Sequence, residues 1–228
     1  MDMEDESKAI QEVAMATAKA IDAAREAGAF ISKYVSGSLE QGMGIFEDKL
    51  KYLRWERSVR YMQRANELLK QTGLDAPTRV VPLNIAIPLM QGASLEEDDL
   101  MQDRWAALLV NAANASYQGE IRRSYASILE QLTSMDAQIL DAIYALPFDA
   151  CQHAGVITVG LPISARIPEV DEKEESLPAE DVILSLSNLT RLGCIRSGMT
   201  WGGGESYSRV NPTIAGKAFV QACRVTTA

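Results

Sequence analysis

Four consecutive acids, Glu96, Glu97, Asp98 and Asp99, are the residues of this chain that come nearest to a chemical site by type and spacing. Clustered carboxylates can hold a divalent cation or transfer protons. Carboxylate metal sites in helical bundles also draw Glu-x-x-His motifs from several helices. The chain has one histidine, His153, and it lies in a different segment. We therefore expect no metal, no cofactor and no catalytic role for these acids.

The same acids have a structural explanation as the start of a helix. Ser94 and Glu97 match the capping box S-x-x-E, and acids in a first turn complement the positive end of the helix dipole. The sequence predicts a helix over residues 94–114, with Ser94 and Glu97 as its cap. The apolar residues that follow at helical spacing, and that we expect in the core, include Trp105, Leu108 and Leu109.

A second candidate for chemistry is the pair Cys151 and His153, because residues two apart on a strand share a face. A thiol beside an imidazole can act as a nucleophile with its base. The sequence shows no third residue that would orient the histidine, and cysteine is commonly a small buried apolar residue. The chain also lacks a G-x-S-x-G elbow, a Walker loop and the combination of H-x-E with C-x-x-C. We expect no enzyme, and a structural role for His153.

Four arginines, Arg54, Arg57, Arg60 and Arg64, share one face of a helix expected over residues 45–71. Such a face could bind an acidic partner, an anionic lipid surface or a nucleic-acid backbone. The alternative, which most charged helix faces follow, is a solvated face that offsets nearby acids. The net charge of −9 gives no support for nucleic acid as the partner. The four arginines are therefore our candidate contact with a protein, and the solvated face remains the alternative.

The elements named so far belong to a helical bundle predicted over residues 1–132. Its first helix carries a stripe of small residues that could pack within the bundle or against a second copy. Three prolines in the connector are expected to exclude a regular helix there and to favour extended pieces. The expected segments in order are a long helix (7–35), the basic-faced helix (45–71), a proline-rich connector (74–92) and helices over 94–114 and 119–132.

Residues 133–228 are predicted to form a smaller winged-helix-like α+β module. After an exposed and mobile acidic loop (168–178), a leucine-rich helix ends at a glycine, and two strands joined by a triple-glycine turn lead to a last helix. Trp201 lies in that turn and is a further candidate for partner contact. The helix in the recognition position begins with Glu180 and Asp181, which would repel DNA phosphate. We therefore expect a protein contact or a structural role, with DNA binding as the alternative.

The run ASLEEDDLMQDRWAALLVNAANAS, which contains Trp105, resembles the defining segment of the abortive-infection alpha family of bacterial proteins. The stretches VVPLNIAIPLMQGASLE before it and YASILEQLTSMDAQILDAI after it are similar to the same family. The resemblance extends over residues 40–225. It implies a soluble, mainly helical bacterial protein connected with defence against phage, and it brings no catalytic residues.

The remaining sequence features concern the place and mode of action. Three cysteines without a C-x-x-C pair, and an acidic N-terminus unlike a signal peptide, indicate a reducing cytosol. The longest uncharged runs are shorter than the roughly 20 apolar residues of a membrane-spanning helix. The sequence thus predicts a cytosolic, mainly α, non-enzymatic protein that limits phage by binding a protein partner or itself. The alternatives are a DNA-binding regulator and a membrane-acting effector that uses the N-terminal amphipathic helix; no small-molecule substrate is indicated.

Overall fold

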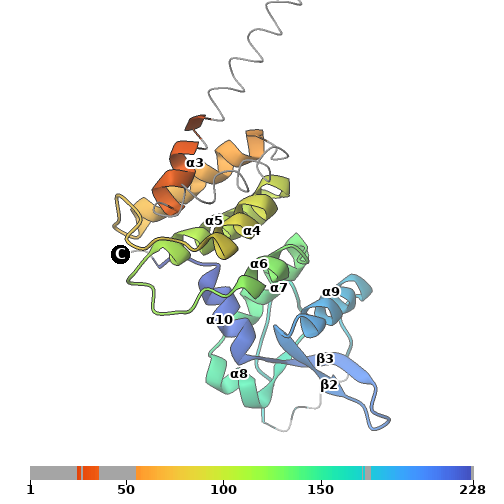
Figure 1. Cartoon of the computed structure of the whole chain (residues 1–228). Coiled ribbons are helices and arrows are strands. Elements are labelled where there is room, and N and C mark those ends of the chain that lie inside the picture. The colour runs from red at the N-terminus through yellow and green to blue at the C-terminus, as the bar shows by residue number, and fades with distance from the viewer. Residues whose placement is uncertain (1–24, 27, 36–54, 171, 173–175, 227–228) are drawn as a thin grey trace, which may run out of the picture.

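Helices dominate the fold, and a small antiparallel sheet lies in its C-terminal part (Figure 1). This computed structural model describes residues 25–26, 28–35, 55–170, 172 and 176–226. The predicted mainly α class with a small α+β module is confirmed. The elements are α3 (Trp55–Gln71), α4 (Leu83–Leu95), α5 (Asp99–Ala113), α6 (Arg123–Leu129), α7 (Ser134–Tyr144), α8 (Phe148–Ala154), β1 (Val156–Ile157), α9 (Glu180–Arg191), β2 (Ile195–Met199), β3 (Glu205–Pro212) and α10 (Ile214–Ala222).

The N-terminal part is a group of helices in which α3, α4 and α6 all contact α5. The helical residues 28–35 pack against α3, where the rings of Phe30 and Tyr61 meet edge to face with centroids 6.2 Å apart. The backbone N–H of Val81 also donates to the carbonyl of Tyr34 at 3.0 Å. The described end of the predicted long first helix therefore packs on the bundle. Its earlier part, and the start of the predicted helix over 45–71, lie outside the described residues.

α4 runs through the proline-rich segment, so the prediction of a connector without a regular helix was wrong. Pro82 is the N-cap, where a missing N–H has little consequence because the first N–H groups of a helix have no intrahelical partner. Pro88 lies inside the helix and does remove a hydrogen bond. Burial of apolar surface offsets that cost. The α4 side chains that enter the core include Ala86, Leu89, Met90 and Ala93.

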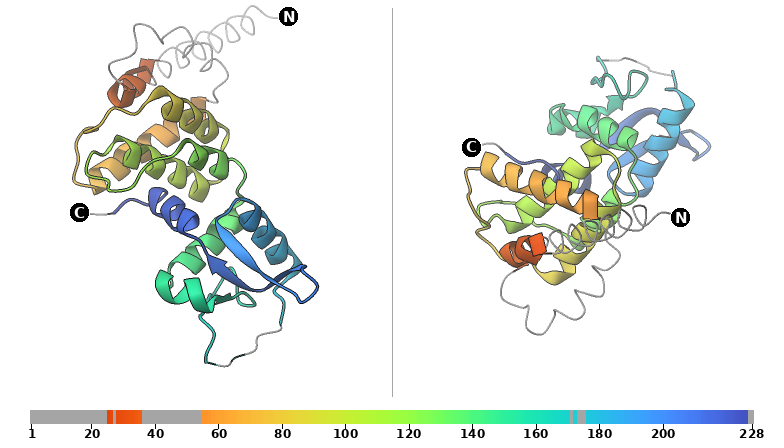
Figure 2. Two further views of the ribbon diagram at one scale, coloured as in Figure 1. Left: turned by 60° about the horizontal axis from the view of Figure 1, so that its bottom comes forward. Right: turned by 90° about the horizontal axis from the view of Figure 1, so that it is seen from above.

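The C-terminal part is a three-stranded antiparallel sheet in the order β1-β3-β2 with helices around it. α9 contacts β2 and α8 contacts β3, and the β2–β3 hairpin extends away from α10 in both Figure 1 and Figure 2. The predicted leucine-rich helix, hairpin and last helix are confirmed as α9, β2–β3 and α10. Thr213 caps α10, because its hydroxyl accepts the N–H of Gly216 at 2.9 Å.

One continuous core joins the two parts across residue 132. It contains Trp105, Leu108 and Leu109 of α5, which are buried as predicted. Asn111 in α5 adds a polar tie, because its amide donates at 2.8 Å to the carbonyl of Ala222 and at 2.8 Å to that of Arg224. The C-terminal end of α10 is therefore held by the central helix of the bundle.

The acidic loop predicted over residues 168–178 is described at 168–170, 172 and 176–178. Within it, Glu172 forms an ion pair with Arg166, with a shortest distance of 2.6 Å between Oε1 and a guanidinium nitrogen. This pairing holds the pKa of Glu172 down to about 2. The loop is thus attached at Glu172 to the segment that precedes it.

Candidate functional site

The acidic run at 96–99 is built into the start of α5. Asp98 is the N-cap: its Oδ1 accepts the N–H of Met101 at 3.0 Å, and its Oδ2 accepts the hydroxyl of Ser134 at 2.6 Å. The hydroxyl of Ser134, and then the N–H of Met101, hold the pKa of Asp98 below its ordinary value. The carboxylate therefore starts one helix and ties it to the first turn of α7.

The predicted capping box of Ser94 and Glu97 was wrong. Ser94 is buried in the last turn of α4, where its hydroxyl donates to the carbonyl of Gln91 at 2.8 Å. The S-x-x-E pattern spans the junction between two helices, because α4 ends at Leu95 and α5 begins only at Asp99. The helix start is real, but its cap lies four residues later than the pattern indicated.

Replacing Asp98 with alanine should lower the free energy of unfolding at pH 7 by about 1 kcal/mol, the usual cost of losing an N-cap carboxylate. Ser94→Ala should cost less, since that hydroxyl caps nothing. Because the pKa of Asp98 is lowered by folding, its contribution is complete above the unfolded value of about 3.9 and is lost as pH falls through the folded value. Urea titrations at pH 7 and in acid would measure both effects; an equal cost for Ser94→Ala would contradict this assignment.

The predicted arginine face is used inside the chain. Arg64 forms a two-pronged contact with Asp103, at 2.7 and 2.9 Å, and Arg60 forms an ion pair with Asp99. Arg57 donates to a backbone carbonyl just before α5 at 3.1 Å. These three arginines of α3 therefore neutralise the acidic start of α5. This is the arrangement expected from the alternative interpretation, in which the arginine face offsets nearby acids. The fourth arginine, at position 54, lies outside the described residues.

Cys151 and His153, considered as a candidate pair on a strand and not expected to be catalytic, both lie in α8. Residues two apart on a helix do not face each other. The thiol of Cys151 is fully buried while His153 is exposed, and burial raises the pKa of that thiol. Burial also raises the pKa of Cys194 to about 12 and that of Cys223 to about 12. Thiols in this state are poor nucleophiles at neutral pH.

The side chains of α9 best suited to reading base edges, the half-buried Asn188 and the exposed Arg191, are hydrogen-bonded within the chain. The amide of Asn188 donates to the carbonyl of Gln131 at 2.8 Å and to Oδ2 of Asp136 at 3.1 Å. Arg191 donates to the side-chain oxygen of Gln131 at 2.9 Å and to that of Asn188 at 2.6 Å. The other exposed side chains of α9 are those of its acidic first turn and Leu184, which is 68 % exposed.

The hairpin tip (residues 199–204) presents apolar side chains on a fixed turn. Trp201 is fully exposed and Met199 is 78 % exposed. The N–H of Thr200 donates to the carbonyl of Gly204 at 2.8 Å, and the N–H of Gly203 donates to that of Thr200 at 2.9 Å. Gly203 has a φ of 80°, in the left-handed region that favours glycine. The triple glycine thus closes the turn and leaves Trp201 in solvent.

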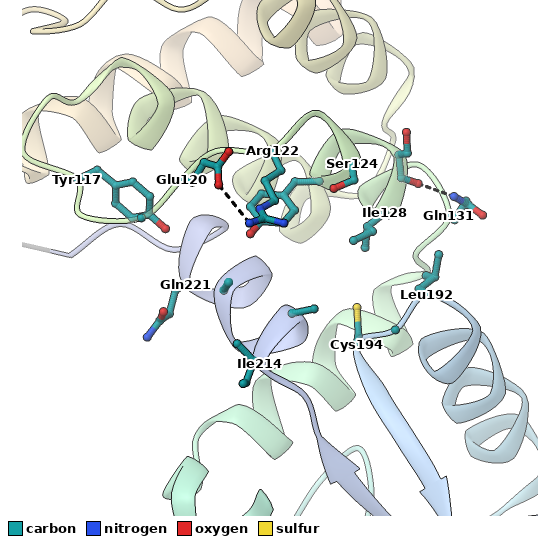
Figure 3. A pocket seen from close by; sticks show the side chains of 16 residues that line it. Tyr117, Glu120, Arg122, Ser124, Ile128, Gln131, Leu192, Cys194, Ile214 and Gln221 are labelled. Carbon is teal, nitrogen blue, oxygen red and sulfur yellow. Dashed lines mark hydrogen bonds and ion pairs between the residues drawn. The ribbon is translucent and has the colours of Figure 1, made fainter.

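A groove of about 720 Å³, here called the α10 groove, lies where α6, α10 and the corner between α9 and β2 meet (Figure 3). Figure 3 shows Ile128 of α6 facing Leu192 and Cys194 of the corner. The ion pair of Glu120 and Arg122, at 3.2 Å, lies at its rim. Sequence reasoning missed this groove, because its walls come from three segments that are far apart in the chain.

The model of the abortive infection alpha family matches residues 56–223, well over half of the chain. The chain belongs to this family. The resemblance inferred from the Trp105 run is therefore confirmed, and membership connects the protein with abortive infection. No curated protein and no solved structure matches the chain.

The matched region of this abortive infection alpha protein contains the α5 start, the hairpin tip and the α10 groove. Within the described ranges, no three or more His, Cys, Asp or Glu side chains are grouped so that they could hold a metal ion. Among the residues that the structure describes, no helix has the length and apolar character needed to cross a membrane.

Proposed function

We propose that this protein acts against phage in the cytosol as a non-enzymatic binding protein whose hairpin tip contacts a protein partner. The exposure of Trp201 and Met199 on a closed turn carries the proposal. Tryptophan and methionine are enriched in protein interfaces, and tryptophan is among the residues that most often dominate binding energy. A turn already fixed in its conformation loses little entropy when it binds.

The internal bonds of α9 favour a protein over DNA as the partner. In the winged-helix-like reading of the module, α9 takes the recognition position and the β2–β3 hairpin is the wing. Asn188 and Arg191 are occupied within the chain, and the exposed first turn of α9 is acidic. The raised thiol pKa values likewise support binding over catalysis by a cysteine nucleophile.

The test of function is phage plating on cells that express the protein. Trp201→Ser should lose the protection that the wild type gives, because it removes the anchor without touching the core. Trp201→Phe should retain part of it. Ile163→Ser is the matched control, since Ile163 is 94 % exposed and is not part of the hairpin tip. Full protection by Trp201→Ser, or equal loss with Ile163→Ser, would contradict the proposal.

Retention on duplex DNA tests the alternative that this protein is a DNA-binding regulator. Phosphate contacts make affinity fall steeply as salt rises. We expect the protein to pass through a column of immobilised duplex DNA at low salt without delay. Retention that disappears with added salt, and that needs Arg196 of the hairpin, would favour DNA as the partner.

A further inference from the structure

The hairpin tip and the α10 groove complement each other within one chain. We propose that the α10 groove receives Trp201 of a second copy of this chain. This inference rests on the proposed function of the hairpin tip, and it adds the identity of the partner. The tip is a protruding apolar side chain, and the groove is an apolar hollow of about 720 Å³.

The lining of the α10 groove suits an indole ring. Small residues on one wall, among them Ala215 and Ala218 of α10, allow a flat ring to approach the helix closely. Ile128 and Leu192 supply apolar contact across from them. An indole also carries one N–H that needs an acceptor when buried. Oxygen atoms at the rim that could accept it belong to Glu120, Ser124 and Gln221.

The tip of a chain cannot reach its own groove. Cys194 lines the groove, and β2 begins at the next residue and leads outward as an extended strand. Trp201 follows Cys194 by seven positions, a distance of roughly 20 Å along a strand. Figures 1 and 2 both show the hairpin running away from α10. The rigid arm that places Trp201 far from one groove is what allows it to enter another.

A reciprocal exchange makes one contact serve both copies. In a two-fold dimer each chain offers its tip and receives its partner's tip, so both exposed tryptophans and both grooves are covered together. If the two contacts cannot close on each other, the same insertion continues from copy to copy into longer assemblies. The closed dimer covers both copies of Trp201, and an open assembly leaves Trp201 exposed only in a terminal copy.

Light scattering after size exclusion tests the inference on the full chain over a range of concentrations. The wild type should have a mass above that of the monomer. Trp201→Ser should be monomeric, and Trp201→Phe should associate more weakly than the wild type. Ala218→Arg should also be monomeric, because it places a charged side chain in the groove. Ala150→Arg is the matched control, since Ala150 is an exposed alanine of α8 outside the groove.

Two further measurements keep the result interpretable. Ala215→Arg obstructs the same groove from an exposed position, so it should also be monomeric even if Ala218→Arg folds poorly. Tryptophan emission of the wild type should shift to shorter wavelength as concentration rises and Trp201 leaves water. That shift should be absent in Trp201→Phe and in Ala215→Arg.

The inference and the proposed function fail in different ways. A wild type that is monomeric at every concentration overturns the inference, as does association that survives Trp201→Ser or both groove substitutions. If the wild type is monomeric but Trp201→Ser loses protection, the tip binds another protein and the proposed function stands. If Trp201→Ser disrupts assembly but retains protection, the inference stands and the proposed function fails.

Discussion

Replacing Trp105 with alanine should lower the free energy of unfolding by about 3–5 kcal/mol, the usual cost of removing a large buried aromatic side chain. Trp105 is 1 % exposed and lies at the centre of the core that α5 shares with its neighbours. Trp105→Phe should cost less, because its indole N–H has no hydrogen-bond partner among the described residues. Urea titration would measure both values. If Trp105→Ala lowered the free energy of unfolding no more than Trp105→Phe does, the result would contradict a core built around Trp105.

The contact between Trp105 and α4 gives a sharper form of the same prediction. A Cβ at Gly92 would lie 2.7 Å from Cζ2 and 2.8 Å from Cζ3 of the indole, closer than carbon atoms normally approach. Gly92→Ala should therefore destabilise the wild type. A phenyl ring lacks these outer indole atoms, so Gly92→Ala should cost much less in Trp105→Phe. Strictly additive effects in this double-mutant cycle would show that the ring does not lie against Gly92.

Asp141→Ala should be the second most damaging substitution, and it should lower the free energy of unfolding by about 2–3 kcal/mol. Asp141 of α7 forms ion pairs with Arg104 of α5 and with Arg224 beyond α10, so it joins three parts of the core boundary. Loss of one partner of a buried pair typically costs about 3–5 kcal/mol, because the other charge stays buried without compensation. We expect less than the full amount, since the side chain of Asp141 is 38 % exposed.

An asymmetry between the two partners tests this explanation. Arg104→Met should lower the free energy of unfolding less than Asp141→Ala does. After Arg104→Met, Asp141 keeps its ion pair with Arg224 and some contact with water. After Asp141→Ala, the guanidinium of Arg104 loses its ion pair, and Arg104 is only 6 % exposed. Asp149→Ala is the control, because Asp149 is an exposed acid of α8. This substitution should change the free energy of unfolding by no more than about 0.5 kcal/mol. Thermal unfolding of the three variants would rank them. Equal costs for the two partners would mean that burial of the guanidinium is not the cause.

Local patterns predicted the parts of the fold that depend on local physics. The apolar spacing around Trp105 and the triple-glycine turn marked α5 and the hairpin, because helix amphipathicity and turn geometry are set by neighbouring residues. Pro88 misled the prediction, since its local cost is outweighed by the burial of α4, which depends on α3 and α5. Ser94 misled it as well, because a capping pattern does not show whether the preceding helix has ended.

The candidate site was less predictable, because it depends on contacts between distant segments. The arginines of α3 were visible in the sequence, but their partners Asp99 and Asp103 lie 39 residues away from Arg60 and Arg64. Trp201 could be placed at a hairpin tip because a turn is local. The α10 groove had no local signal, since Gly193, Ile128 and Ala218 become neighbours only after α6, α9 and α10 pack together.

Photo-crosslinking from position 201 tests most directly the claim that the hairpin tip binds a protein. A photoreactive phenylalanine analogue would replace Trp201 in full-length protein inside infected cells, and in a parallel variant it would replace Ile163. We expect a discrete protein adduct from position 201 and none from position 163. Adducts to nucleic acid or lipid alone, or no protein adduct from position 201, would contradict the binding of a protein by the hairpin tip.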